Sequence, residues 1–284
     1  MTTGDEIFRR IQSKARSDGA TTTKPAPTGE YLTRHALESF LDRLMHTRHA
    51  GDFVVKGGLL LGAYGVRRPT RDADAEAIET SVTAEHIVAV VRDIAAVLID
   101  DGVAFDIDSI STQEIRDQAE YPGIRLRINY TIGPARGVAA WDVSAGDPIV
   151  PAPRRVRLPR VLGDAIELLG YAAETTVAEK GVTILERGIT STRWRDYVDI
   201  VQLCRSHDLN EDDVFASARA VARHRGIRLE PIATHMIGYG AIAQPRWAAW
   251  RRKEGLQDIS EENLDDQLAL VSRYLDPIFA RHQG

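Results

Sequence analysis

Two aspartates one residue apart, Asp72 and Asp74, lie in the alternating stretch TRDADA that begins at Thr70. Side chains at positions i and i+2 of a strand point to the same face, so we expect both carboxylates to point the same way. Two like charges at such a spacing are costly unless a cation lies between them. Mg²⁺ is the cation that proteins hold with carboxylates and substrate phosphates. The pair therefore predicts a magnesium site, although an isolated Asp-x-Asp pair also occurs on solvent-facing strand edges.

A two-metal site needs a third acid on a neighbouring strand, and Asp142 in the alternating stretch AAWDVS is the best candidate. We expect Asp72, Asp74 and Asp142 to be catalytic and to hold two Mg²⁺ ions, with Mn²⁺ as a possible substitute. One ion would activate an attacking oxygen and the other would stabilise a leaving pyrophosphate.

The glycine pair Gly57-Gly58 precedes an apolar run and follows Lys56. A turn without Cβ atoms lets backbone N–H groups approach phosphate oxygens, and the start of a helix adds positive potential. We therefore predict that Lys56, Gly57 and Gly58 bind the triphosphate of a nucleotide. A glycine pair alone is more often only a turn, so the prediction depends on its combination with the acids.

Hydrophobic periodicity predicts the elements that must position these residues. The N-terminal part contains both helices and strands. Helices are expected at 31–49 and 83–100, a strand, turn and helix at 53–66, and strands at 71–78, 103–111, 124–132 and 137–146. A proline-rich connector follows at 148–161, and helices are expected at 162–185, 194–207, 211–226 and 263–282. The alanines at 73 and 75 are poor strand formers, so the strand of the aspartates is expected to be short or irregular. The predicted class is α+β, with a mixed-sheet domain at 1–152 and a mostly helical domain at 153–284.

Composition excludes several classes of protein. The 284 residues carry a net charge of −5, so overall charge does not indicate a nucleic-acid partner. No apolar run is long enough to span a bilayer, and the N-terminal stretch lacks the apolar core of a secretory signal. The single cysteine, Cys204, excludes an internal disulfide. We expect a cytoplasmic protein without a membrane partner.

The series KGG, TRDAD, WDVS, EK and RDYVD resembles the DNA polymerase β-like nucleotidyltransferase superfamily, and within it the AbiEii toxins, including the mycobacterial MenT group. The resemblance covers about residues 50–205, and the last hundred residues give no motif match. It implies a polymerase β-like mixed sheet followed by a helical domain that completes the active-site cleft.

The resemblance also implies site residues in the helical half. Lys180 would be catalytic and contact the triphosphate, although a lysine beside the core is the alternative. Asp196 would orient Lys180 or Arg193 or contact the nucleotide, and Arg193 would bind the nucleotide. Asp199 is expected to be structural, in an ion pair with Arg195.

Thr70 and Arg71 lie just before Asp72, and the role expected of Thr70 comes from the same resemblance. Arg71 would contact phosphate. Thr70 would be a regulatory phosphorylation site, because a phosphate there would repel the nucleotide and occupy the metal acids. A hydroxyl that bonds to local backbone is the alternative for Thr70.

Basic residues beside aromatic ones suit unpaired nucleic-acid ends, through phosphate contact and stacking. One such group lies in PRWAAWRRKEG and a second in RRVRLPR. The alternative is that the tryptophans pack in the core while the charges face water. The candidate RNA contacts are Arg154, Arg155, Arg246, Trp247, Arg251 and Arg252.

The sequence favours a toxin that transfers a nucleoside monophosphate from a nucleoside triphosphate to an acceptor, with release of pyrophosphate. The resemblance implies that the acceptor is the 3′ end of tRNA, so that translation is blocked, and that an antitoxin encoded nearby is a partner. Two alternatives remain open: transfer to a small molecule or a protein, and a catalytically silent nucleotide-binding module.

Overall fold

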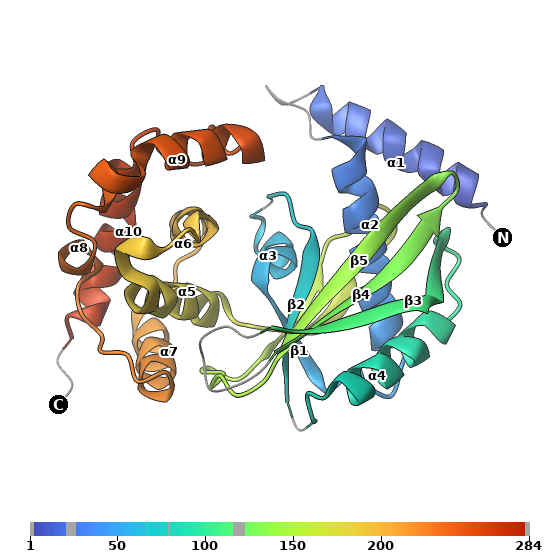
Figure 1. Cartoon of the computed structure of the whole chain (residues 1–284), viewed down its shortest axis with the longest axis horizontal. Coiled ribbons are helices and arrows are strands. Elements are labelled where there is room, and N and C mark those ends of the chain that lie inside the picture. Colours follow the sequence, from blue (N-terminus) through green and yellow to red (C-terminus); the bar gives the residue numbers. More distant parts are fainter. Residues whose placement is uncertain (1–2, 21–26, 67, 79, 116–122, 282–284) are drawn as a thin grey trace. The chain divides into compact units, whose positions relative to one another are not determined.

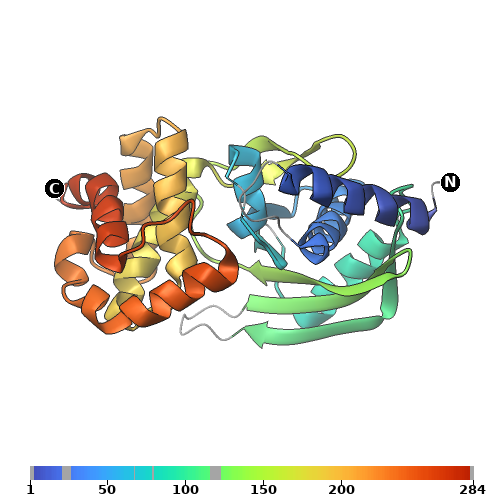
Figure 2. The same ribbon diagram turned by 90° about the horizontal axis from the view of Figure 1, so that it is seen from above.

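A computed structural model describes residues 3–20, 27–66, 68–78, 80–115 and 123–281. The chain forms two compact units (Figures 1 and 2). The first, the sheet unit, comprises Met1–Ala63, Pro69–Gly146 and Arg154–Gly170. The second, the helical unit, comprises Tyr64–Arg68, Asp147–Pro153 and Tyr171–Gly284. The α+β class predicted from the sequence is confirmed.

A seven-stranded mixed sheet in the order β3-β4-β5-β2-β1-β7-β6 forms the sheet unit within the described residues. The strand of the aspartates, β2, is central: it pairs parallel with β5 and antiparallel with β1. The strands are β1 (Phe53–Lys56), β2 (Asp72–Ala77), β3 (Val103–Ile115), β4 (Gly123–Ile132), β5 (Ala135–Ser144), β6 (Arg154–Leu158) and β7 (Ile166–Gly170).

Helices α1 (Gly4–Gly19), α2 (Thr28–Met45) and α4 (Ala84–Ala96) pack on one face of this sheet (Figure 1). The α4 helix begins where the sequence predicts, because the side chain of Thr83 accepts a hydrogen bond from the backbone N–H of His86. On the covered face, the rings of Phe40 and Phe53 pack against Trp141, which is almost fully buried. The opposite face of β4 and β5 carries half-buried and exposed polar side chains.

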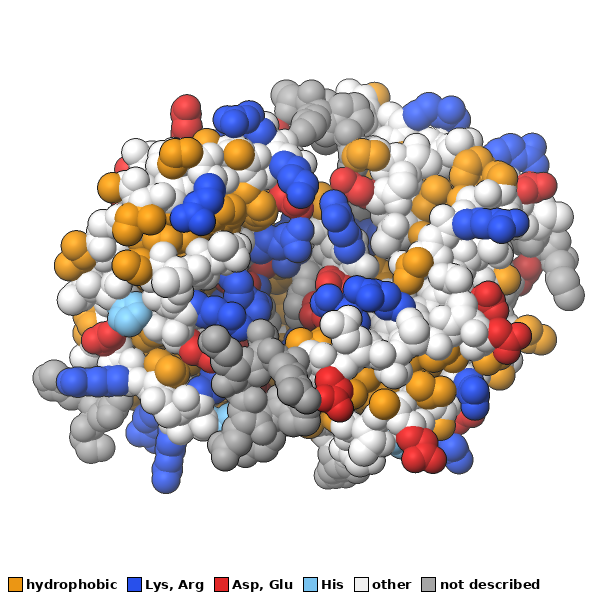
Figure 3. Space-filling view, viewed as in Figure 1, with side chains coloured by type: hydrophobic (Ala, Val, Ile, Leu, Met, Phe, Trp, Pro, Cys, Tyr) orange, Lys and Arg blue, Asp and Glu red, His pale blue; other side chains and the backbone are white. Residues whose placement is uncertain are grey.

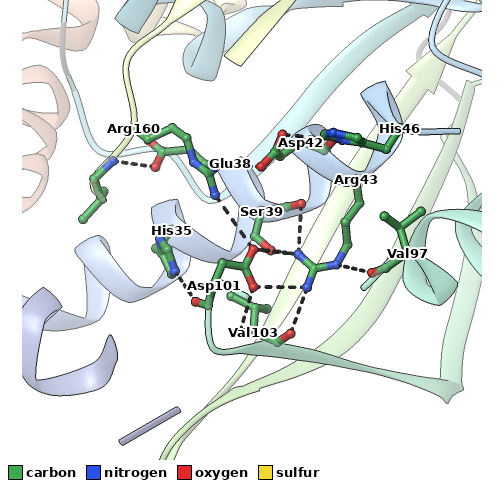
Figure 4. Close-up of polar contacts among 11 residues, drawn as sticks. His35, Glu38, Ser39, Asp42, Arg43, His46, Val97, Asp101, Val103 and Arg160 are labelled. Atoms are coloured by element: carbon green, nitrogen blue, oxygen red, sulfur yellow. Dashed lines mark hydrogen bonds and ion pairs between the residues drawn. The ribbon is translucent and has the colours of Figure 1, made fainter. Parts of the chain in front are cut away.

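A buried polar network fixes α2 to the turn that precedes β3 (Figure 4). The guanidinium of Arg43 donates to both carboxylate oxygens of Asp101, at 2.7 and 3.1 Å, and to the backbone carbonyls of Val97 and Val103. Ser39 also donates to Asp101, at 2.6 Å. The ion pair and the hydrogen bonds compensate the buried charges of Arg43 and Asp101, so this network can hold α2 against the turn inside the protein.

Helices form most of the helical unit, beginning directly after β7. They are α5 (Ala173–Arg187), α6 (Trp194–Ser206), α7 (Glu211–His224), α8 (Ile232–His235), α9 (Tyr239–Glu254) and α10 (Leu264–Phe279). Short helical turns occur after β1, at α3 (Gly57–Leu60) and η1 (Leu61–Tyr64), and after α5, at η2 (Gly188–Thr190). None of the helices in the described ranges is long and apolar enough to cross a membrane.

Residues 154–170 differ from the sequence prediction. The proline-rich stretch was expected to be a connector and the following segment a helix, but β6 and β7 form an antiparallel pair there. Val55 of β1 pairs with Gly170 of β7, so this hairpin extends the sheet. The sheet unit therefore continues beyond the predicted boundary at 152/153. Contact with β1, which is distant in sequence, decides the conformation of Ile166–Gly170, whose apolar residues fit a helix or a strand.

Candidate active site

Strand β2 directs three carboxylates to one face of the sheet. Asp72, Asp74 and Glu76 alternate with alanines that are buried against the helices. Asp142 of β5 is the register partner of Asp74, so its side chain leaves the same face. We call Asp72, Asp74, Glu76 and Asp142 the acid face. The three aspartates predicted from the sequence therefore lie on adjacent strands and on one side of the sheet.

The strand of the aspartates is regular, contrary to the expectation from Ala73 and Ala75. Both alanines are fully buried, and β2 pairs along both edges. Ala73 is the register partner of Trp141, whose large indole is buried against Phe40 and Phe53 on the covered face. A small side chain fits beside this large one, so tertiary packing overrides the low strand propensity of alanine.

Arg125 of β4 binds the acid face directly. It is the register partner of Asp142, and its guanidinium donates to both carboxylate oxygens, with Nε 2.7 Å from Oδ1 and Nη2 against Oδ2. The same Nη2 lies 3.7 Å from Oδ2 of Asp72. The hydrogen bonds to Asp142 raise the pKa of Arg125 further above its usual value, so the guanidinium remains charged. This arginine was not predicted from the sequence.

Lys56 of β1 is the register partner of Asp74, and its ammonium lies 2.8 Å from Oε2 of Glu76. The hydroxyl of Ser144 donates to the same oxygen at 2.7 Å. Glu76 is only 1% exposed, so these partners stabilise its buried charge. The ammonium predicted to bind phosphate is therefore held at the acid face by Glu76.

Gly57 lies against Asp74 and has a positive φ of 69°. A Cβ atom at this position would overlap the carboxylate of Asp74. Only glycine can combine this backbone conformation with such a close approach. Gly57 and Gly58 are the first residues of α3, directly after β1, so the predicted phosphate-binding turn adjoins the acid face.

The donor chemistry of the acid face suits a hard divalent cation, because carboxylate oxygens from two adjacent strands share one side of the sheet. In the arrangement seen here, however, both oxygens of Asp142 contact Arg125. Within the described ranges, no three His, Cys, Asp or Glu side chains are grouped closely enough to hold a metal ion. Asp72 and Asp74 fit such an ion in type and direction, whereas both carboxylate oxygens of Asp142 are bound by Arg125.

The residues predicted in the helical half meet in a second group, which we call the lysine cluster. The ammonium of Lys180 on α5 lies 2.5 Å from Asp196 and 2.9 Å from Asp199, both on α6. Arg193 donates to the other oxygen of Asp196 at 2.7 Å, so the expected contacts of Asp196 with Lys180 and Arg193 are present. Arg68 donates to both oxygens of Asp199 at 2.8 and 3.0 Å.

The lysine cluster keeps its charges although it is buried. Burial alone would lower the pKa of Lys180, but Asp196 and Asp199 outweigh it, and the pKa lies above its usual value. Burial would raise the pKa of Asp196, but Lys180 and Arg193 hold it well below its usual range. The ammonium of Lys180 is thus held by two carboxylates, whereas the side chain of Arg193 is 49% exposed.

The predicted ion pair between Asp199 and Arg195 is wrong. Arg195 instead pairs with Glu254 of α9 at 2.7 Å. Asp199 points to the buried side of α6, where it meets Arg68 and Lys180. Spacing of four residues permits a contact along a helix, but the buried cations satisfy Asp199 better than an exposed arginine does.

Arg71 and Thr70 directly precede β2. Arg71 is exposed and Thr70 is half-buried, one and two residues before Asp72. Both therefore lie at the end of the strand that carries the aspartates.

Two of the predicted RNA contacts are corrected by their burial. Trp247 is fully buried, its indole N–H donates to the carbonyl of Glu261, and its ring stacks on Trp250 at 5.3 Å between centroids. The buried guanidinium of Arg251 donates to the side chain and carbonyl of Ser260. Both side chains stabilise the helical unit instead of forming a binding surface.

The other predicted RNA contacts are exposed. They are Arg154 and Arg155 on β6, and Arg246 and Arg252 on α9. Figure 3 shows basic, acidic and hydrophobic side chains interspersed on the visible face of each unit, in keeping with the low net charge.

Three charged residues at these sites were missed by the sequence analysis: Arg125, Glu76 and Arg68. Glu76 continues the alternation of the two aspartates and could have been found by extending the i, i+2 pattern one step. Arg125 and Arg68 have no local signal, since the register of β4 and the packing of α6 bring them to their partners.

A family model described as the nucleotidyl transferase AbiEii toxin of type IV toxin–antitoxin systems matches residues 39–270, which include both the acid face and the lysine cluster. The chain belongs to this family. It is therefore a nucleotidyltransferase toxin, with a nucleotide as substrate and an antitoxin as the counterpart that its family implies. No curated protein matches the chain.

Two solved structures share the fold of this AbiEii-family toxin. JHP933 from Helicobacter pylori is 13% identical, with a TM-score of 0.51 over 88% of this chain and 92% of its own. A Helicobacter pylori protein suggested to be a nucleotidyltransferase is 14% identical, with a TM-score of 0.52 over 88% of this chain and 95% of its own. At such identities the likeness concerns the fold alone.

Proposed function

We propose that this AbiEii-family toxin transfers a nucleoside monophosphate from a nucleoside triphosphate to the 3′ end of tRNA, as in the MenT group that its motifs resemble. The observation that carries the proposal is the pairing of Asp74 with Asp142 on one face of the sheet, beside the glycine turn at Gly57. Extension of the 3′ end would block aminoacylation and thereby translation.

In this proposal, Asp72 and Asp74 would hold Mg²⁺, and Asp142 would be a further ligand if Arg125 moved away. The metal would supply positive charge that stabilises the phosphates as charge develops on them. Backbone N–H groups at Gly57 and Gly58 bind the triphosphate. Asp142 accepts the proton of the acceptor's 3′ hydroxyl as that oxygen bonds to the α-phosphorus, and the bond from this phosphorus to pyrophosphate breaks.

The lysine cluster has a positioning role in the same proposal. Lys180 and Asp196 fix each other in a buried pair, and Asp196 directs the half-exposed guanidinium of Arg193. A planar guanidinium suits a phosphate and the side chain of Arg193 is half-exposed, so Arg193 is the nucleotide contact of this cluster. Arg71, exposed next to Asp72, is a second phosphate contact.

The acceptor RNA would be bound by the exposed arginines Arg154, Arg155, Arg246 and Arg252. Phosphate contacts of this kind give affinity that falls with rising salt concentration and carry little sequence information. Selection of the tRNA end would therefore depend on the shape and the unpaired bases of the acceptor.

The test is incubation of the purified wild type and of Asp72→Ala with total RNA and each of the four α-labelled nucleoside triphosphates. The proposal predicts a labelled band of tRNA length for the wild type only. Label on protein or on small molecules would support the alternative acceptor classes. Nucleotide binding without any pyrophosphate release would support the silent binding module.

A further inference from the structure

The guanidinium of Arg125 already places a positive charge at the acid face. Arg125 donates bidentate hydrogen bonds to the carboxylate of Asp142, and its Nη2 also lies 3.7 Å from Oδ2 of Asp72. We propose that Arg125 competes with the divalent metal for these two carboxylates, so that the metal binds only when the guanidinium leaves. This inference rests on the proposed function, in which the acid face holds a divalent ion.

The geometry explains the competition. A metal ion shared by Asp142 and Asp72 must contact an oxygen of each, and Nη2 of Arg125 already contacts Oδ2 of Asp142 and lies 3.7 Å from Oδ2 of Asp72. Two cations cannot occupy this position together, because they would repel at short range. The Arg125 side chain is 34% exposed, so it has room to turn toward solvent without unpacking the core.

The charges of the acid face support the same conclusion. Among the described residues, the acid face brings four carboxylates together with the cations of Arg125 and Lys56. Lys56 is paired with the buried Glu76, whereas Arg125 is paired with Asp142 and lies near Asp72, so its departure would release these two aspartates to a metal. A released guanidinium would meet the anionic triphosphate, and this contact would make binding of metal and of nucleotide mutually favourable.

The experiment measures the affinity of the full-length protein for Mn²⁺, without nucleotide, by electron paramagnetic resonance of the free ion. Arg125→Met should bind Mn²⁺ about tenfold or more tightly than the wild type, since a competing unit charge has been removed from the site. Arg125→Lys, which retains the charge without the planar fork, should lie between the two. The matched control is Arg136→Met, because Arg136 is exposed on the same face of β5 as Asp142 but six residues before it, and its affinity should equal that of the wild type.

Circular dichroism establishes that each variant is folded. Adding Asp142→Asn to Arg125→Met should abolish the gain, which identifies Asp142 as the ligand that Arg125 withholds. Equal or weaker Mn²⁺ binding by folded Arg125→Met, or no Mn²⁺ binding by any variant, overturns the inference. A clear gain in Mn²⁺ affinity without any labelled RNA would overturn the proposed acceptor while leaving the competition intact.

Discussion

Asp74 of β2 and Asp142 of β5 are register partners on two parallel strands, and their carboxylates leave the same face of the sheet. They are far apart in sequence, and no local pattern brings them together. The central place of β2, paired with β5 on one side and β1 on the other, fixes this relationship and brings Lys56 and Arg125 into the same row. The composition of the acid face therefore depends on strand register.

The buried pair of Lys180 and Asp196 predicts a large loss of stability on truncation. Lys180→Met leaves two buried carboxylates with one cation fewer, so the free energy of unfolding should fall by about 3–5 kcal/mol. Urea unfolding measures the change. Lys253→Met, at an exposed lysine of α9, is the control and should change it by no more than about 0.5 kcal/mol. Equal effects of the two substitutions would show that the cluster does not stabilise the helical unit.

The same cluster predicts a dependence on pH. The pKa of Asp196 is depressed in the folded protein, so its contribution is present above the unfolded pKa of about 3.9 and is lost as the pH falls toward the folded value. The difference in unfolding free energy between the wild type and Asp196→Asn should be constant between about pH 5 and 7 and shrink below about pH 4. Urea unfolding at several pH values measures it, and a difference that grows on acidification would contradict this assignment.

Gly57 predicts a loss of both stability and activity when it is replaced by alanine. Gly57→Ala forces a side chain into a positive φ, which costs about 1–2 kcal/mol, and also pushes Asp74 out of place. Gly65→Ala is the matched control, because Gly65 has a φ of 72° but open space around its Cβ position. Both variants should lose stability, measured by thermal unfolding, and only Gly57→Ala should lose nucleotidyl transfer. Loss of transfer in both would remove the link between Gly57 and Asp74.

The two stacked tryptophans of α9 should differ in their effect on stability. Trp247 is fully buried, so Trp247→Ala should lower the unfolding free energy by about 3–5 kcal/mol. Trp250 is half-buried, so Trp250→Ala should lower the unfolding free energy by less than Trp247→Ala does. Chemical unfolding measures the free energy of unfolding of both variants. An equal or larger loss for Trp250→Ala would contradict the packing described for α9.

Substitution of Thr70 tests the prediction that this residue is a regulatory phosphorylation site. A negative charge two residues before Asp72 adds to the acid face, so Thr70→Glu should slow nucleotidyl transfer by about tenfold or more. Thr70→Ser keeps the hydroxyl and should remain active. The measurement is the initial rate of label transfer, and an unchanged rate for Thr70→Glu would exclude regulation by phosphorylation at this position.

Local sequence patterns were sufficient to predict β2 and β5 and to place Asp72 and Asp74 on one face, because alternation decides which side chains of one strand share a face. They could not distinguish Arg125 from Arg127, since both alternate in the same way along β4. Only the register of β4 with β5 places Arg125 opposite Asp142. The same limit explains Arg68, which meets Asp199 through tertiary packing.

The part of the sequence that was expected to be helical, from residue 162 onward, shows where periodicity fails. Residues 166–170 carry apolar side chains that fit either a helix or a strand, and pairing with β1 and β6 made them a strand. Trp247 was predicted to contact RNA because basic residues surround it in sequence, yet on the helix it faces the core while Arg246 faces solvent. Adjacent residues of a helix point in different directions, so a basic aromatic stretch is weak support for a binding surface.

The central claim is that the acid face carries out nucleotidyl transfer, and the most direct test is the rate of pyrophosphate release by Asp74→Asn in the presence of Mg²⁺, nucleoside triphosphate and tRNA. Asp108→Asn is the matched control, because Asp108 is an exposed aspartate of β3 in the same unit. We predict that Asp74→Asn abolishes pyrophosphate release while remaining folded, and that Asp108→Asn releases it at the rate of the wild type. Wild-type release by folded Asp74→Asn would contradict the account.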